Sequence, residues 1–175
     1  NSDSSSVTNS TPSKTNSSTV KRGKEINSLL DDCVDIEGKE LDKSFFKGKL
    51  TLINVWGTYC GPCKQEMPAL GYLHDKYSKD YPFQIIGLVI DLTDSKGDID
   101  ATQKRKADLM LQQAKCSYKN IIPTVSWYKW LNTVEYVPTS VFIDESGYAL
   151  DEEIVGGMDT SHWESYIDNF ITNYF

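Results

Sequence analysis

The segment WGTYCGPCKQE, residues 56–66, contains two cysteines three positions apart, Cys60 and Cys63. Such a pair can bind a metal ion, close a structural disulfide or exchange electrons with another protein. A structural zinc site needs four ligands, usually as two close pairs, and the other two cysteines and both histidines stand apart in the sequence. A disulfide across two residues closes a very small loop and therefore stabilises a fold little. We expect no metal, and redox exchange is the favoured interpretation.

The cysteine pair follows an apolar run and opens an amphipathic segment. LTLINVW, residues 50–56, is typical of a central strand that is buried on both faces. From residue 61 to about 79, apolar residues recur at spacings of three and four, which predicts a helix with one apolar face. Pro68 lies inside this segment and is expected to kink it. Cys60 is thereby placed where a strand ends and a helix begins.

A helix start is a favourable place for a reactive thiol. The first backbone N–H groups of a helix lack partners and carry partial positive charge, so they stabilise a thiolate. We therefore expect Cys60 to be the exposed nucleophile and Cys63, one turn further, to be the buried resolving thiol. Pro62 suits the first helical turn, where its missing N–H costs nothing. Exchange would pass through a mixed disulfide on Cys60 that Cys63 resolves.

The remaining pattern predicts an α/β fold with helices on both faces of a sheet. Strand-like and helix-like segments alternate and end in a hairpin and a closing helix. The predicted elements are a hairpin over 31–42, strands over 83–91, 118–122, 137–144 and 148–155, helices over 101–115 and 160–174, and a helical turn over 126–131.

The N-terminal segment differs in composition from the rest of the chain. Residues 1–25 begin with a stretch rich in Ser, Thr and Asn and end in a basic cluster. Such a stretch buries too little apolar surface to offset its chain entropy, so we expect a disordered tether over 1–25 and a folded domain over 26–175. A cloning remnant is the alternative origin of the tether.

Charge and hydropathy exclude several partners. The net charge is −7, and no basic stripe with interleaved aromatic residues is present, so we expect no nucleic-acid binding. No apolar run reaches the roughly 18 to 20 residues that span a membrane.

The segment WGTYCGPCKQEMP, followed about 75 residues later by VPTSVFID, resembles the thioredoxin superfamily, and in particular its membrane-tethered, extracytoplasmic TlpA/ResA-like branch. The resemblance covers about residues 28–175 and implies a thioredoxin-like fold with a mixed central sheet and an N-terminal β-hairpin. It also implies a helix–strand insertion of the TlpA or peroxiredoxin type over 101–122. Peroxidase activity is disfavoured, because Thr58 stands only two residues before Cys60 and the second cysteine is present.

The resemblance assigns roles to several further residues. Pro138 would be a cis-proline beside the cysteines that exposes the Val137 backbone for β-type pairing with a client. Glu66 would take part in acid–base work at Cys63, with which it shares a helix face; the alternative is a solvated surface glutamate. Asn54 stands where thioredoxin itself has a buried aspartate. The client-binding surface would further include four residues around the motif, namely Trp56, Tyr59, Gly61 and Pro62, although Trp56 is equally consistent with plain core.

Cys33 and Cys116 lie outside this pattern. Each stands just before or within a predicted short strand. Two separate buried thiols are the favoured interpretation, a mutual disulfide is the second, and a further redox relay is the third.

Taken with the resemblance, the sequence predicts a thiol–disulfide oxidoreductase that reduces client proteins outside the cytoplasm. It would be a monomer without a cofactor, tethered by a removed N-terminal segment and supplied with electrons by a membrane protein of the CcdA/DsbD type. Apocytochrome c, a methionine sulfoxide reductase and surface proteins are the implied clients. A disulfide-forming oxidase and a non-catalytic surface binding module are the alternatives.

Overall fold

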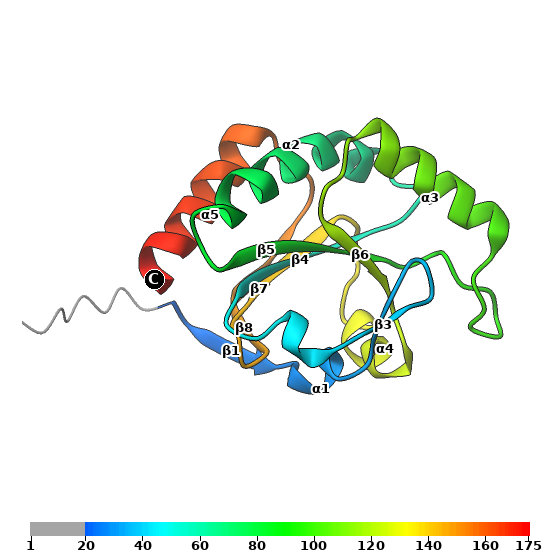
Figure 1. Cartoon of the computed structure of the whole chain (residues 1–175), viewed down its shortest axis with the longest axis horizontal. Helices are drawn as coiled ribbons and strands as arrows, with labels where there is room; N and C mark the ends of the chain where they lie inside the picture. Colours follow the sequence, from blue (N-terminus) through cyan, green and yellow to red (C-terminus); the bar gives the residue numbers. More distant parts are fainter. Residues whose placement is uncertain (1–19) are drawn as a thin grey trace, which may run out of the picture.

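The computed structural model describes residues 20–175, which build an eight-stranded mixed sheet flanked by helices (Figure 1). The strands lie in the order β1-β8-β7-β4-β5-β6-β2-β3. Their bounds are β1 Arg22–Glu25, β2 Cys33–Asp35, β3 Glu40–Leu41, β4 Leu50–Trp56, β5 Phe83–Val89, β6 Lys119–Ile122, β7 Thr139–Ile143 and β8 Tyr148–Val155. The helices are α1 Asn27–Leu30, the short 3₁₀ helix η1 Lys43–Phe45, α2 Gly61–Ser78, α3 Ala101–Gln113, α4 Val125–Leu131 and α5 Thr160–Tyr174.

Strand β4 occupies the middle of the sheet, as its continuous apolar sequence predicts. It pairs in parallel with β5 and antiparallel with β7, and all seven of its residues are buried. Successive side chains point to opposite faces, so Leu52 joins one apolar cluster and Ile53 joins the other. The strand ends at Trp56, and the chain turns through residues 57–60 directly into α2.

Two helical layers cover the two faces of the sheet. Helices α2, α3 and α5 lie over one face, whereas α1 and α4 lie over the other (Figure 1). Trp163 and Phe170 of α5 pack against Phe142 of the sheet on the first side. Trp127 of α4 packs with Ile53 on the second. The predicted α/β fold with helices on both faces is confirmed.

The predicted tether boundary is wrong at its end. Residues 22–25 were assigned to the tether, but they form β1, which pairs antiparallel with β8 at the edge of the sheet. Arg22 also makes an ion pair with the buried carboxylate of Asp144. Polar side chains suit an edge strand, whose faces are exposed, so composition alone did not reveal it. Residues 1–19 of the expected tether lie outside the described residues.

Cys33 and Cys116 are not joined to each other; both are free thiols. Cys33 packs in the cluster under α1 and α4, with its Sγ donating to the Leu29 carbonyl at 3.3 Å. Cys116 packs against the cluster under α2 and α5. The sheet therefore separates them. The favoured prediction of separate thiols is confirmed, although Cys116 is only half-buried.

None of the helices among residues 20–175 combines the length and the apolar character needed to cross a membrane.

Candidate active site

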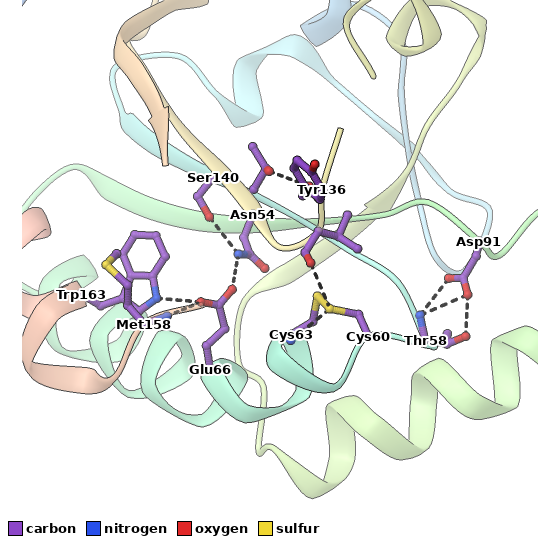
Figure 2. Close-up of a disulfide and its surroundings, with 12 residues drawn as sticks. Asn54, Thr58, Cys60, Cys63, Glu66, Asp91, Tyr136, Ser140, Met158 and Trp163 are labelled. Atoms are coloured by element: carbon purple, nitrogen blue, oxygen red, sulfur yellow. Dashed lines mark hydrogen bonds between the residues drawn. A yellow bond between two sulfur atoms is a disulfide. The ribbon is translucent and has the colours of Figure 1, made fainter. Parts of the chain in front are cut away.

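A disulfide joins Cys60 and Cys63 at the start of α2 (Figure 2). Cys60 is the N-cap residue of the helix, and its Sγ accepts a hydrogen bond from the Cys63 amide at 3.2 Å. Pro62 lies in the first turn, where no intrahelical partner for its nitrogen is needed. The sulfur that the sequence placed at a helix start is therefore in contact with an amide that can stabilise negative charge.

Cys60 is less exposed than the sequence predicted. In the disulfide, 6% of Cys60 and 1% of Cys63 is accessible to solvent. The carbonyl oxygen of Val137 lies 3.6 Å from Cys60 Sγ and covers it from the sheet side. The order of exposure agrees with the prediction, because Cys63 is the more deeply buried sulfur, but the description of Cys60 as an exposed residue is wrong for this state.

Val137 and Pro138 bring the start of β7 to the cysteine pair. The peptide bond between them is cis. The Pro138 carbonyl is used within the fold, because it accepts a hydrogen bond from the Gly156 amide at 2.8 Å. Thr139 Oγ1 donates to the Tyr136 carbonyl at 2.6 Å and holds the preceding turn. The loop before β7 and the β8–α5 connection thus meet beside the disulfide.

Glu66 is buried, with 2% of its surface exposed. Asn54 Nδ2 donates to Oε1 at 2.8 Å, while Trp163 Nε1 and the Met158 amide donate to Oε2 at 3.0 Å and 3.2 Å (Figure 2). Burial raises the pKa of the Glu66 carboxyl, and the bonds from Trp163, Asn54 and Met158 oppose that rise. The alternative of a solvated surface glutamate is therefore wrong.

Asn54 connects the central strand to this carboxyl group. The same Nδ2 that contacts Glu66 also donates to Ser140 Oγ of β7 at 2.9 Å. Its Oδ1 is buried and has no hydrogen-bond partner among residues 20–175. The sequence did not identify Ser140, Met158 or Trp163 as part of the site. The helix that carries Trp163 was predicted, but only the packing of α5 beside α2 reveals the hydrogen bond from Trp163 to Glu66.

Trp56 is core and not a client-binding rim residue. It is fully buried, and its Nε1 donates to Asn120 Oδ1 of β6 at 2.9 Å. Gly87 makes room for this pair, because a Cβ at that position would lie 1.9 Å from Asn120 Oδ1 and 2.9 Å from Trp56 Nε1. The prediction that assigned Trp56 to client binding is corrected, since its side chain packs in a cluster with Met67 of α2 and Met110 of α3.

The other residues around the motif that were predicted to bind clients lie on the surface beside the disulfide. Tyr59 is 69% exposed, and Gly61 and Pro62 are exposed beside the disulfide. Tyr59 and Val137 are among the residues that line a pocket of about 440 Å³. It is mainly apolar and aromatic, and its other lining residues are Val55, Ile90, Pro123, Tyr128, Leu131, Asn132, Val134, Glu135 and Tyr136.

Within residues 20–175, no group of three or more His, Cys, Asp or Glu side chains could hold a metal ion. The chemistry available at this site is that of two sulfurs that can form and break a disulfide, with a buried carboxyl group on the same helix. A thiolate that attacks a disulfide through a mixed intermediate is the reaction for which these groups suffice.

Comparison with known proteins agrees with this chemistry. The model of the Redoxin family matches residues 8–113. Thiol-disulfide oxidoreductase ResA of Bacillus thuringiensis subsp. konkukian is 35% identical over 133 residues, which cover 76% of this chain and 70% of that protein.

Solved structures share the fold. A putative thiol:disulfide interchange protein DsbE from Chlorobium tepidum has a TM-score of 0.66 at 20% identity and covers 89% of this chain and 99% of its own. A secreted Mycobacterium tuberculosis disulfide oxidoreductase homologous to E. coli DsbE has a TM-score of 0.61 at 15% identity, covering 81% and 98%. The chain therefore belongs to the Redoxin family, as a TlpA/ResA-like thiol-disulfide oxidoreductase of the thioredoxin superfamily.

Proposed function

We propose that the protein reduces disulfides of client proteins outside the cytoplasm, with Cys60 as the attacking thiol and Cys63 as the resolving thiol. The observation that carries this proposal is the position of Cys60 Sγ. It caps α2, accepts the Cys63 amide hydrogen bond and contacts the carbonyl of Val137, a residue that lines a pocket. Cys63 lies beneath it and is nearly inaccessible, so a client sulfur would reach Cys60 first.

The reaction transfers two electrons from the dithiol to the client. The Cys60 thiolate attacks one client sulfur; a sulfur–sulfur bond to Cys60 forms, the client disulfide breaks, and the second client sulfur leaves as a thiolate. Cys63 then loses its proton and attacks Cys60 Sγ. The mixed disulfide breaks, the remaining client thiolate leaves, and the Cys60–Cys63 disulfide forms.

Glu66 would accept the proton of Cys63 in the second step. It lies three residues further along α2, so the two side chains share a helix face, and its carboxyl group is buried with a raised pKa. A base with a pKa closer to the operating pH is a better proton acceptor and donor than an exposed glutamate. The three donors that surround its oxygens hold it in place.

A client would dock on the surface around Cys60. The half-buried Val137 backbone is suited to β-type pairing with an extended client segment. Tyr59, Gly61 and Pro62 lie at the exposed rim, and the pocket beyond Tyr59 would accept an apolar client side chain. Apocytochrome c, a methionine sulfoxide reductase and surface proteins are the candidate clients, with a CcdA/DsbD-type membrane protein as the electron donor.

The extracytoplasmic location rests on likeness and on composition. The M. tuberculosis protein that shares the fold is described as secreted. The Ser/Thr/Asn-rich start of this chain would serve as a spacer between a membrane anchor and the folded domain.

The reduction potential of the Cys60–Cys63 pair tests the proposed direction. The protein is equilibrated in graded thiol–disulfide buffers, and the free thiols are trapped and counted by mass. We expect a value near that of thioredoxin, about −270 mV. A value near that of a strong oxidant, about −120 mV, would reverse the direction and support an oxidase. In parallel, Cys63→Ser should trap a client as a mixed disulfide on Cys60. A Cys60→Ser variant with unchanged cellular function would instead support a non-catalytic binding module.

A further inference from the structure

A hydrogen-bond network holds the turn that leads into Cys60. The Asp91 carboxylate accepts the Thr58 amide at 3.0 Å and 3.1 Å, through Oδ1 and Oδ2, and the Thr58 hydroxyl at 2.6 Å (Figure 2). Gln103 Nε2 donates to Asp91 Oδ2 at 3.1 Å and to Thr58 Oγ1 at 3.3 Å. We refer to Thr58, Asp91 and Gln103 as the turn clamp.

The turn clamp joins three elements that are separate in sequence. Thr58 and Asp91 each stand two residues after the end of a parallel strand, β4 and β5 respectively, and the last paired residues of these strands are opposite each other. Their side chains therefore meet at one edge of the sheet. Gln103 comes from the first turn of α3, in the segment that the sequence identified as an insertion. The insertion thus contacts the loop next to the disulfide.

Thr58 is an internal residue of the turn that ends at Cys60. The Cys60 amide donates to the Gly57 carbonyl at 3.1 Å, so residues 57–60 form a closed turn, and Asp91 binds both the backbone and the side chain of its second residue. Any movement of Thr58 changes where Cys60 meets the start of α2. The hydrogen bond between Cys60 Sγ and the Cys63 amide, which stabilises a thiolate, depends on that position.

We propose that the turn clamp positions Cys60 for attack, with Thr58 and Asp91 as positioning residues and Gln103 as their support from α3. The proposal rests on the proposed function, in which Cys60 is the attacking thiol. It assigns to the insertion a part in the reactivity of a sulfur with which it shares no hydrogen bond. A clamp that only stabilised the fold would leave the reactivity of Cys60 unchanged.

Two substitutions of Thr58 distinguish a clamp that positions Cys60 from a clamp that only stabilises the fold. Thr58→Val keeps the shape of the side chain and removes the hydroxyl donor, whereas Thr58→Ser retains it. In the reduced proteins, the rate of Cys60 alkylation by iodoacetamide is followed from pH 5 to 10, with the modified cysteine identified by mass. We expect Thr58→Val to slow alkylation at pH 7 by about three- to tenfold, through a smaller thiolate fraction. Thr58→Ser should stay within about twofold of the native rate.

Two further variants complete the design. Gln103→Leu removes the hydrogen bonds from α3 to Thr58 and Asp91. We expect it to decrease the alkylation rate of Cys60 less than Thr58→Val does, and it also serves as the test if Thr58→Val does not fold. Asp94→Ala is the matched control, because Asp94 lies three residues beyond Asp91 and accepts bonds from the Lys96 and Asp98 amides within its own loop. The other titratable groups at the site, which are the Cys63 thiol of the reduced protein and Tyr59, Glu66, Glu135 and Tyr136, are retained in every variant.

The outcomes are distinct. An alkylation profile of Thr58→Val that superimposes on the native profile overturns the proposal, even if the thermal midpoint falls. An equal change in Asp94→Ala also overturns it, because the effect would then belong to the loop in general. If Cys60 of the native protein reacts no faster than Cys63, the proposed function itself fails, and this result is seen before any variant is compared.

Discussion

At the residue scale, Glu66 is a buried carboxyl group held by three hydrogen-bond donors. A carboxyl group with 2% exposure is costly to ionise unless donors surround it, and Asn54, Trp163 and Met158 supply such donors. Burial still raises its pKa above the ordinary value of 4.5. The residue therefore combines a fixed position with an increased tendency to hold a proton.

Glu66→Gln tests this role directly. The amide cannot take up the Cys63 proton, so we expect the mixed disulfide on Cys60 to resolve about tenfold more slowly or worse, as followed by acid quench and alkylation. Its NH₂ group would also face donors, which should lower the free energy of unfolding by about 1–3 kcal/mol. The exposed Glu152→Gln is the control and should change neither quantity. Unchanged resolution in Glu66→Gln would remove Glu66 from the mechanism.

The stability of the native protein relative to Glu66→Gln should change with pH in a defined direction. A carboxyl group whose pKa is raised in the folded state holds its proton longer there than in the unfolded chain, so stability is lost as the pH rises through the folded pKa. We therefore expect the native protein to lose stability relative to Glu66→Gln as the pH rises above 4.5, the ordinary value for glutamate. Urea unfolding at several pH values measures this difference.

At the element scale, α2 is attached to the sheet by a polar contact within its apolar face. The Ile85 amide of β5 donates to His74 Nδ1 at 3.0 Å. Pairing of β5 with β6 begins one residue later, at Ile86, so the Ile85 amide has no strand partner on that side. Burial lowers the pKa of His74, which keeps the ring neutral and able to accept this bond.

His74→Phe should therefore have an effect that depends on pH. At neutral pH we expect the free energy of unfolding to fall by about 1–3 kcal/mol, because the Ile85 amide loses its acceptor. The folded pKa of His74 is lowered, so the native protein itself loses this stabilisation as the pH falls below 6.5, the ordinary value. The difference between native protein and variant should shrink between about pH 7 and 5, as measured by urea unfolding.

The exposed His162→Gln is the control for this measurement, since His162 lies at the start of α5 and its ring bonds the exposed Asp159. It should retain the native loss of stability on acidification. A constant difference between His74→Phe and the native protein across the same range would show that protonation of His74 does not break the contact.

At the scale of the whole molecule, the sheet is completed by a strand that the sequence assigned to the tether. Strand β1 pairs with Tyr148 and Leu150 of β8, and the Ile26 amide that follows it donates to the Gly147 carbonyl at 2.7 Å. Without β1, strand β8 would become an exposed edge with unpaired backbone groups, which favours aggregation.

Two shortened chains test the boundary. We expect a chain of residues 26–175 to unfold at a lower urea concentration than a chain of residues 20–175, and to aggregate more readily, because only the longer one retains β1. Chemical unfolding and light scattering measure both properties. Equal stability of the two chains would restore the predicted boundary at residue 26.

Local chemistry explains which parts of this protein could be predicted from its sequence. The apolar run of residues 50–56 has to be a buried strand, and the spacing of the following apolar residues has to form a helix. Together they place Cys60 at the helix start, where neighbouring residues alone supply the amides that affect its sulfur. Elements β4 and α2, the hairpin of β2 and β3, and the helix α5 were therefore predictable, as was the redox interpretation of the cysteine pair.

Tertiary structure alone decided which distant residues complete the site. The donors to Glu66 come from β4, the β8–α5 connection and α5. The carbonyl that contacts Cys60 is that of Val137, before β7, and the residues that bind Thr58 come from the loop after β5 and from α3. The same packing buries Trp56 and separates Cys33 from Cys116 on opposite faces of the sheet. Such contacts depend on strand order and helix placement, and residue spacing along the chain carries no direct record of either.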